Sequence, residues 1–203
     1  MAAPASRRLI TLCRALVSVS LLLAVPVAGQ ILFTDVTEQT DLDAFIGEEA
    51  RNVVIVDFDN DGFQDVFITE NTFSSRRIGL YHNTGDGGLE DQTSRLPAEL
   101  NLKNGGAGSI FGDYDNDGDE DLFLVAWPHN VLLRNDRGMF TRADPGSDLT
   151  DSLQTENAVW LDYDRDGYLD LYVSSRYASA TYTLRANRLL RNQGDGTFTD
   201  QTA

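Results

Sequence analysis

Three nine-residue segments with the pattern Asp-x-Asp-x-Asp-Gly-x-x-Asp constrain what this chain can fold into more than any other feature. They occupy residues 57–65, 113–121 and 162–170. Four carboxylates in each segment repel one another, and an ordinary solvated turn needs only one or two aspartates. A cation relieves this repulsion, and oxygen ligands on a flexible loop favour Ca²⁺ over Mg²⁺, which demands tighter octahedral geometry. The pattern therefore predicts three Ca²⁺-binding loops.

The glycine at the sixth place of each motif, and the apolar residues that follow, distinguish these loops from an EF-hand. The glycine allows the sharp reversal that brings the end of the loop back to its start. An EF-hand has the same opening, but it requires a glutamate at the twelfth place and flanking helices. At the twelfth place this sequence has Ile68, Leu124 and Val173. The EF-hand interpretation is therefore excluded.

Each motif lies inside a longer repeat of four short apolar segments. One segment precedes the motif, one follows it, a third ends in asparagine, and a fourth comes after a Gly/Asp turn. The third segments end at Asn83, Asn135 and Asn192, which we call the marker asparagines. β-Branched and aromatic residues fill the segments, which favours strands over helices. Four short strands in roughly 50 residues are typical of one blade of a β-propeller.

The repeats predict an all-β fold, a partial β-propeller of three four-stranded blades. The blades are expected at approximately residues 52–93, 108–144 and 157–202, within a repeat region that spans 30–203. A large apolar residue stands two places before each motif, and we interpret it as core between blades. These residues are Ile55, Phe111 and Trp160. The alternative role for Trp160 is a ligand platform.

The first 29 residues have the features of a helical secretory signal peptide. Three arginines precede an apolar run over residues 15–25, and small residues before Gln30 suit cleavage there. The apolar run is too short to span a bilayer. We therefore expect residues 1–29 to be removed and the mature chain to be secreted, to the periplasm or cell surface if the source is bacterial. The alternative is a poorly cleaved signal that acts as a membrane anchor.

The charge balance and the cysteine content limit the possible partners and cross-links. The chain has 32 acidic and 16 basic residues, a net charge of −16. Such a surface argues against nucleic acid and anionic lipid as partners. The only cysteine, Cys13, lies in the predicted signal peptide, so the mature chain has no disulfide. We expect bound metal to provide the cross-linking that disulfides give many secreted domains.

Two segments resemble a known family. Residues 106–122, which contain the second motif, and residues 187–202, which contain the last marker asparagine, are similar to FG-GAP (VCBS-type) repeats. The resemblance is strongest to the cartilage acidic protein group and its bacterial relatives, and it covers about residues 31–202. It implies a Ca²⁺-binding β-propeller related to the head of the integrin α-chain, with a role in adhesion.

The resemblance also implies which residues bind the three Ca²⁺ ions. In the family, the aspartates at places one, three, five and nine and the backbone carbonyl at place seven are the ligands. In the first loop these are Asp57, Asp59, Asp61, Phe63 and Asp65. In the second loop they are Asp113, Asp115, Asp117, Asp119 and Asp121. In the third loop they are Asp162, Asp164, Asp166, Tyr168 and Asp170.

The chain departs from the family in its number of blades. Family propellers usually have about seven blades, and three sheets cannot close a ring. Residues 31–37 echo the last strand near residues 198–202 and are expected to form a displaced closing strand. The chain is then either a fragment of a longer seven-bladed protein or a protein that self-associates through its exposed terminal blades.

A second functional surface is expected at the end of the sheets opposite the Ca²⁺ loops. The loops after each second strand emerge there, and they concentrate arginines and aromatic residues, which are common binding anchors. The candidate ligand-binding residues are Arg76, Arg77, Trp127, His129, Arg176 and Tyr177, with Tyr182 beside them. An extracellular protein or an anionic glycan would fit this surface. The alternative is a set of ordinary exposed loops.

The sequence contains no recognisable catalytic constellation. His82 lies in a strand-like segment, and we interpret it as a partly packed strand residue rather than a base. The carboxylates outside the motifs that merit attention are Glu70, Asp148 and Glu156. The sequence thus predicts a secreted, Ca²⁺-binding, non-catalytic adhesion or recognition module. The alternatives are an extracellular enzyme that acts on polysaccharide or phosphoester, and the fragment described above.

Overall fold

The computed structural model describes most of the chain after the predicted signal peptide. The described residues are 33–42, 50–70, 78–98, 100, 106–126, 129–144, 146, 155–175 and 187–202. The chain divides into two compact units, Met1–Asp35 and Val36–Ala203, and the fold given below is that of the second unit. Within the described part, no helix has the length and apolar character needed to cross a membrane. The predicted signal peptide, residues 1–29, lies outside the described residues.

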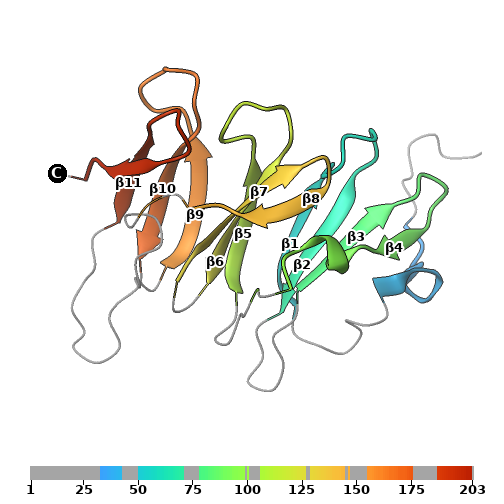
Figure 1. The fold of residues 1–203 in the computed structure, drawn as a ribbon. Coiled ribbons are helices and arrows are strands. Elements are labelled where there is room, and N and C mark those ends of the chain that lie inside the picture. Colours follow the sequence, from blue (N-terminus) through green and yellow to red (C-terminus); the bar gives the residue numbers. More distant parts are fainter. Residues whose placement is uncertain are drawn as a thin grey trace, which may run out of the picture. The chain divides into compact units, whose positions relative to one another are not determined.

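Short antiparallel β-strands build three four-stranded sheets (Figure 1). The first sheet contains β1 (Ala50–Val56), β2 (Asp65–Glu70), β3 (Ile78–Asn83) and β4 (Leu89–Asp91). The second contains β5 (Gly106–Gly112), β6 (Asp121–Ala126), β7 (Val131–Asp136) and β8 (Met139–Arg142). The third contains β9 (Thr155–Leu161), β10 (Asp170–Ser175), β11 (Arg188–Asn192) and β12 (Phe198–Asp200). The predicted all-β fold of three four-stranded blades is confirmed.

The residues before β1 do not form the expected closing strand. Residues 33–36 have no regular secondary structure, and Thr37–Gln39 forms a short 3₁₀ helix, η1. The prediction of a strand over 31–37 is therefore wrong in the described part of that segment. The fourth strand of each sheet is β4, β8 or β12. Further along the chain, the Asp41 carboxylate accepts a hydrogen bond from the backbone N–H of Asp91, in β4, at 3.3 Å.

The acidic motifs form the loops between the first and second strands of each sheet. Each loop is closed at its base by a cross-strand pair: Val56–Asp65, Gly112–Asp121 and Leu161–Asp170. Figure 1 shows these loops, between β1 and β2, β5 and β6, and β9 and β10, at the same end of the sheets. The fold therefore places the three acidic loops side by side.

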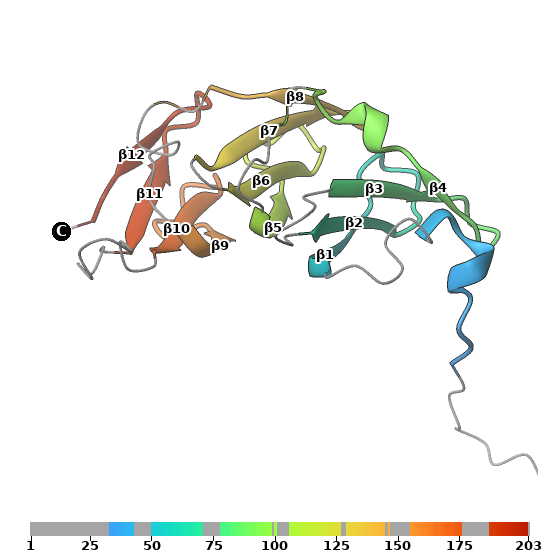
Figure 2. The same ribbon diagram turned by 90° about the horizontal axis from the view of Figure 1, so that it is seen from below.

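Two hydrophobic cores hold together the neighbouring sheets that Figure 2 shows side by side. Between the first and second sheets the buried residues are Val56, Phe58, Phe67, Leu80, Leu96, Leu122, Leu124, Ala126, Val131, Leu133 and Phe140. Between the second and third sheets they are Tyr114, Phe123, Val125, Leu132, Ala158, Leu171, Val173, Leu190 and Phe198. Alternate side chains of a strand point to opposite faces, and every residue of β6 is buried. The second sheet is therefore covered on both faces.

Phe111 and Trp160 occupy the predicted core position between blades. Phe111 packs edge-on against Phe67 with 5.5 Å between ring centroids, and Trp160 packs in the second core. A Cβ on Gly112 would lie 2.6 Å from Trp160 Cδ1, so glycine makes room for the indole. Ile55, at the same position of the first sheet, is 57% exposed, and the prediction is wrong there. Its side of β1 faces away from the second sheet, and no described sheet covers it.

Candidate metal centres

The three acidic loops share one backbone turn that contains two residues with positive φ. The glycine at the sixth place has φ of +92°, +94° and +91° in the three loops. Residues with a side chain rarely adopt this positive-φ region of backbone conformation. The fourth place is also left-handed, at Asn60 (59°), Asn116 (61°) and Arg165 (64°). Asparagine visits this region more readily than arginine does. The glycine was expected from the sequence, whereas the left-handed fourth residue was not.

The side chain of the first aspartate of each motif accepts hydrogen bonds from backbone N–H groups of its own loop and so stabilises the turn. In the first loop, the Asp57 carboxylate accepts hydrogen bonds from the backbone N–H groups of Asp61 at 3.1 Å and Gly62 at 2.9 Å. Asp113 and Asp162 accept the equivalent bonds in the second and third loops. These bonds hold the carboxylate in one orientation, as outer hydrogen bonds do for metal ligands.

The ninth aspartate of each motif is fully buried and links separate segments of its sheet. Asp121 accepts hydrogen bonds from the backbone N–H groups of Tyr114 at 3.1 Å and Asn135 at 2.8 Å. Asp65 and Asp170 accept the equivalent pair of bonds. The ninth place therefore attaches the loop to the third strand, a structural role that the motif alone did not indicate.

Burial raises the pKa of several motif carboxylates. The pKa of Asp121 is raised to about 8, because burial disfavours its charged form; the Asn135 N–H opposes this change and the Asp115 carboxylate adds to it. The pKa values of Asp65, Asp115 and Asp170 are also raised, in each case chiefly by burial. A divalent cation among these carboxylates would favour their charged form.

Side chains that can hold a metal ion converge in each loop. The groups whose ligand atoms lie within 4.8 Å of one another are Asp57–Asp59–Asp61, Asp59–Asp65–His82, Asp113–Asp115–Asp121 and Asp162–Asp164–Asp170. The Oδ1 atoms of Asp59 and Asp115 are buried without a hydrogen-bond partner. Such oxygens are costly when unpaired, and hard divalent cations such as Ca²⁺ prefer them as ligands. The residues therefore fit a divalent cation.

Most of the predicted ligand side chains belong to these groups. Places one, three and nine are represented in all three loops, and place five is represented in the first loop by Asp61. In the second loop, the Asp117 carboxylate accepts a hydrogen bond from the backbone N–H of Asp119 at 3.0 Å. In the third loop, Asp166 lies 2.9 Å from Arg191. The ligand roles of the individual aspartates, and of the carbonyls of Phe63, Asp119 and Tyr168, stay predictions.

The loops differ in one side chain that comes from the third strand of each sheet. The residue directly before the marker asparagine is His82 in β3, Arg134 in β7 and Arg191 in β11. Arg191 places Nε 2.6 Å from Asp164 Oδ2 and Nη2 2.9 Å from Asp166 Oδ2, and the hydrogen bond to Asp164 above all raises its pKa. His82 is a partly buried residue of strand β3, as the sequence predicts, and its imidazole also lies against the first loop, 3.5 Å from Asp59 Oδ2. An alignment of the three repeats with one another shows this difference between histidine and arginine in the sequence.

The marker asparagines join neighbouring blades. The side chain of Asn135, in the second sheet, donates a hydrogen bond to the backbone carbonyl of Phe58 in the first loop at 2.7 Å. The side chain of Asn192, in the third sheet, donates to the carbonyl of Tyr114 in the second loop at 2.8 Å. Each of these two acidic loops is therefore held by the following sheet.

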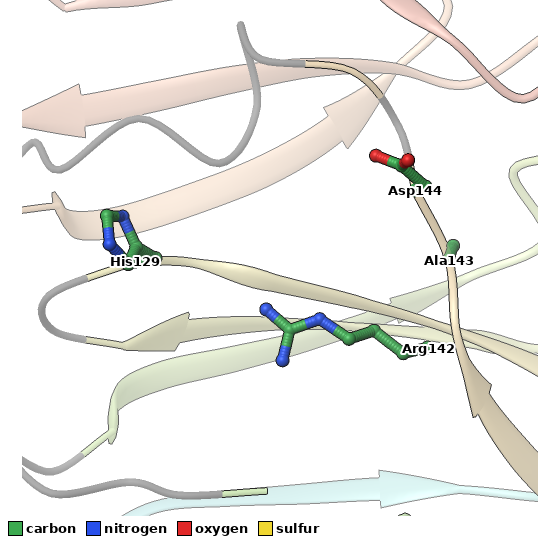
Figure 3. Close-up of a pocket in the computed structure, with 4 residues that line it drawn as sticks. All are labelled: His129, Arg142, Ala143 and Asp144. Carbon is green, nitrogen blue, oxygen red and sulfur yellow. The ribbon is translucent and has the colours of Figure 1, made fainter.

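A pocket lies at the other end of the second sheet, where β7 begins and β8 ends (Figure 3). It is lined by His129, Arg142, Ala143 and Asp144, and the Arg142 guanidinium extends toward His129. The predicted ligand-binding residues that lie outside the described residues are Arg76, Arg77, Trp127, Arg176, Tyr177 and Tyr182. Arg142 was missed because it ends a fourth strand rather than lying in a loop after a second strand.

The carboxylates considered for catalysis come from different sheets. Glu70 ends β2 in the first sheet, and Glu156 lies in β9 in the third. Asp148 lies outside the described residues. The described positions therefore do not form a carboxylate pair on one sheet.

Four-stranded sheets that pack face to face, each with an acidic loop between its first two strands, define the class of propeller-type repeat proteins. A family model described as an FG-GAP-like repeat matches residues 57–124 and 113–173, together more than half of the chain. The chain belongs to the FG-GAP-like repeat family, as the sequence resemblance predicted. A search among curated proteins found no match.

Proposed function

We propose that this protein is a secreted, non-catalytic recognition module whose acidic loops each bind one Ca²⁺ ion. The observation that carries the proposal is the convergence of three carboxylates in each loop, with unpaired buried oxygens at Asp59 and Asp115. Repeats of this family are typical of extracellular or surface domains. Residues 1–29 add the pattern of a secretory signal peptide.

The proposed ligands are the aspartates at places one, three, five and nine, with the backbone carbonyl at place seven. Bound Ca²⁺ would supply the positive charge that clustered carboxylates need. The protein's own contribution is to position them: the first and ninth aspartates are fixed by backbone N–H donors in every loop. At a free Ca²⁺ concentration of about 100 times Kd, each site would stabilise the fold by about 2.7 kcal/mol.

Calcium uptake and thermal stability test this proposal. We expect calorimetry to detect Ca²⁺ binding and excess EGTA to lower the melting temperature by several degrees, as a loss of a few kcal/mol does in a domain of this size. Asp115→Asn removes one charge from the second group with little change in shape, so it should abolish one site and roughly one third of the Ca²⁺-dependent stabilisation.

Asp136→Asn is the matched control, because Asp136 is exposed at the end of β7 and belongs to none of the groups found in the described residues. It should leave Ca²⁺ stoichiometry and melting temperature unchanged. Absence of Ca²⁺ uptake, together with identical melting curves in Ca²⁺ and EGTA, would contradict the proposal.

We also propose that the end of the sheets opposite the acidic loops carries the recognition surface. The pocket there presents Arg142 and His129 in a chain whose net charge is −16. Arginine is a common binding anchor and recognises carboxylate and sulfate-like groups through paired N–H donors. An extracellular protein or glycan that presents such groups fits this surface, whereas nucleic acid is disfavoured by the overall charge.

Binding to sulfated and carboxylated glycans tests the recognition surface. Arg142→Gln should weaken binding by tenfold or more, because it removes the guanidinium from the pocket. Arg137→Gln is the control, since Arg137 is exposed in the turn between β7 and β8, at the end of the sheet that carries the acidic loop. If both variants bind every ligand found as the natural chain does, the pocket is not the recognition site.

A further inference from the structure

The first acidic loop has a nitrogen donor that the other two lack. At the position before the marker asparagine, His82 carries an imidazole, while Arg134 and Arg191 carry guanidinium groups. Imidazole nitrogen can ligate a metal ion, whereas arginine has no acceptor atom. The three loops are therefore not chemically equivalent, even though their motifs are the same.

We propose that a transition-metal ion of the zinc type displaces Ca²⁺ from the first loop and binds there through Asp59, Asp65 and His82, while the second and third loops take Ca²⁺ alone. This inference rests on the proposed function, because it assumes that each acidic loop binds a divalent cation. It goes beyond it by giving one of the three loops a second class of ion.

The distances around His82 match the spacing of ligands at such a site. His82 Nδ1 lies 3.5 Å from Asp59 Oδ2 and 3.5 Å from Asp65 Oδ1. Metal–ligand bonds of about 2.0–2.2 Å in a tetrahedron separate neighbouring ligand atoms by about 3.3–3.6 Å. Imidazole combined with carboxylate is a donor set that suits Zn²⁺ and its neighbours in the first transition row.

A neutral imidazole that carries its proton on Nε2 has a lone pair on Nδ1 for a metal ion. Asp61 Oδ2, 3.6 Å from His82 Nε2, is the carboxylate toward which that N–H would point, an arrangement common for metal-bound histidines. His82 Nδ1 and Asp59 Oδ1 are both buried, and neither has a hydrogen-bond partner. A lone pair that faces two carboxylate oxygens without a cation between them is electrostatically unfavourable.

The surrounding structure holds these groups in place. Phe58 packs edge-on against the imidazole with 6.2 Å between ring centroids. Asp65 is fixed by two backbone N–H donors. Arg95 Nη1 lies 3.6 Å from Asp59 Oδ2, and the Arg95 guanidinium stacks over the Phe58 ring. A protonated imidazole that pairs with the aspartates is the competing explanation.

Cobalt and zinc titrations of the full chain distinguish these explanations. In 1 mM Ca²⁺ we expect one equivalent of Co²⁺ to bind with the visible absorption of a tetrahedral site, and Zn²⁺ to displace it. His82→Arg, which gives the first loop the residue type of the other two, should weaken Co²⁺ binding by at least tenfold. It should leave Ca²⁺ uptake by the second and third loops unchanged.

Nuclear magnetic resonance of the natural chain provides a readout that needs no variant. The chain has only 2 histidines, so the ring nitrogens of His82 can be assigned against those of His129. Zn²⁺ should shift the Nδ1 resonance of His82 to the range of metal-bound imidazole. Normal Ca²⁺ uptake with no Co²⁺ absorption, or Co²⁺ binding that His82→Arg leaves intact, would overturn this inference alone. Loss of all Ca²⁺ uptake would instead overturn the proposed function.

Discussion

At the scale of single residues, the ninth aspartate of each motif is both a structural hydrogen-bond acceptor and a candidate metal ligand. Asp121 is fully buried between two backbone N–H donors, and burial raises its pKa to about 8. Without a cation, this carboxyl group therefore holds a proton near neutral pH. With a divalent cation beside it, the charged form is favoured. Proton and metal ion thus compete for the same residue.

The stability of the metal-free protein should consequently fall between about pH 4 and pH 8. The pKa of folded Asp121, about 8, lies above its ordinary value of 3.8, so the folded chain keeps a proton that the unfolded chain has released. This advantage is lost as the pH rises through the folded-state pKa, with a slope approaching about 1.4 kcal/mol per pH unit for one such group. Saturating Ca²⁺ should reverse the trend, because ligands must be deprotonated. Urea unfolding at several pH values, with and without Ca²⁺, measures both slopes.

Asp121→Asn provides the control for this pH dependence. The variant cannot titrate, and its single side-chain oxygen keeps one of the two backbone hydrogen bonds, because Tyr114 and Asn135 donate to different oxygens of Asp121. Its metal-free stability should change less between pH 4 and pH 8. If the metal-free natural chain instead becomes more stable toward pH 8, the raised pKa of Asp121 is not the controlling factor.

At the scale of structural elements, a single residue in each third strand aligns neighbouring blades. Asn135 in β7 donates hydrogen bonds to the carbonyls of Phe58 and Glu120 and accepts one from the N–H of Gly138. Phe58 lies in the first acidic loop, so this bond crosses between sheets. The hydrogen bonds described for the Asn83 side chain in β3 stay within the first sheet.

Asn135→Ala should therefore destabilise the fold more than Asn83→Ala does. The first change leaves buried backbone groups of two sheets unpaired, and each such group costs about 1–3 kcal/mol. We expect a loss of about 2–4 kcal/mol for Asn135→Ala and a smaller loss for Asn83→Ala, which lies in a more exposed place. Urea unfolding measures both. Equal losses would show that the bond between blades adds nothing to the bonds within one sheet.

The elements themselves were predictable because their signals are local. Alternating apolar residues, glycines and aspartates specify strands and loops within about ten residues. The environment of a loop was harder to predict, since His82 and Arg191 reach it from another strand through sheet pairing. Exposure of Ile55 could not be predicted from its residue type, because burial there depends on whether another sheet covers β1. Arg142 was not predicted, because it reaches the pocket from the end of strand β8 and not from a loop after a second strand.

At the scale of the whole second unit, one face of the third sheet repeats a packing surface that is covered elsewhere. In the second sheet, Ile110 pairs across strands with Phe123, and both pack in the core against the third sheet. In the third sheet, the equivalent pair is Val159 and Tyr172, and these are 52% and 39% exposed. A shallow hollow lined by both residues lies on this face. The open face of the third sheet thus matches the face that a following blade covers.

We expect this open face to pair with the exposed face of β1 on a second copy of the chain, as consecutive sheets pair within one copy. Sedimentation velocity should show association that increases with protein concentration. Tyr172→Lys and Ile55→Lys should each weaken it by at least tenfold, because a charge at the centre of an apolar contact must be desolvated. Met139→Lys is the control, since Met139 is 53% exposed on β8, away from both faces. A chain that stays monomeric at high concentration, or that loses association equally with Met139→Lys, would show that blade faces do not join copies.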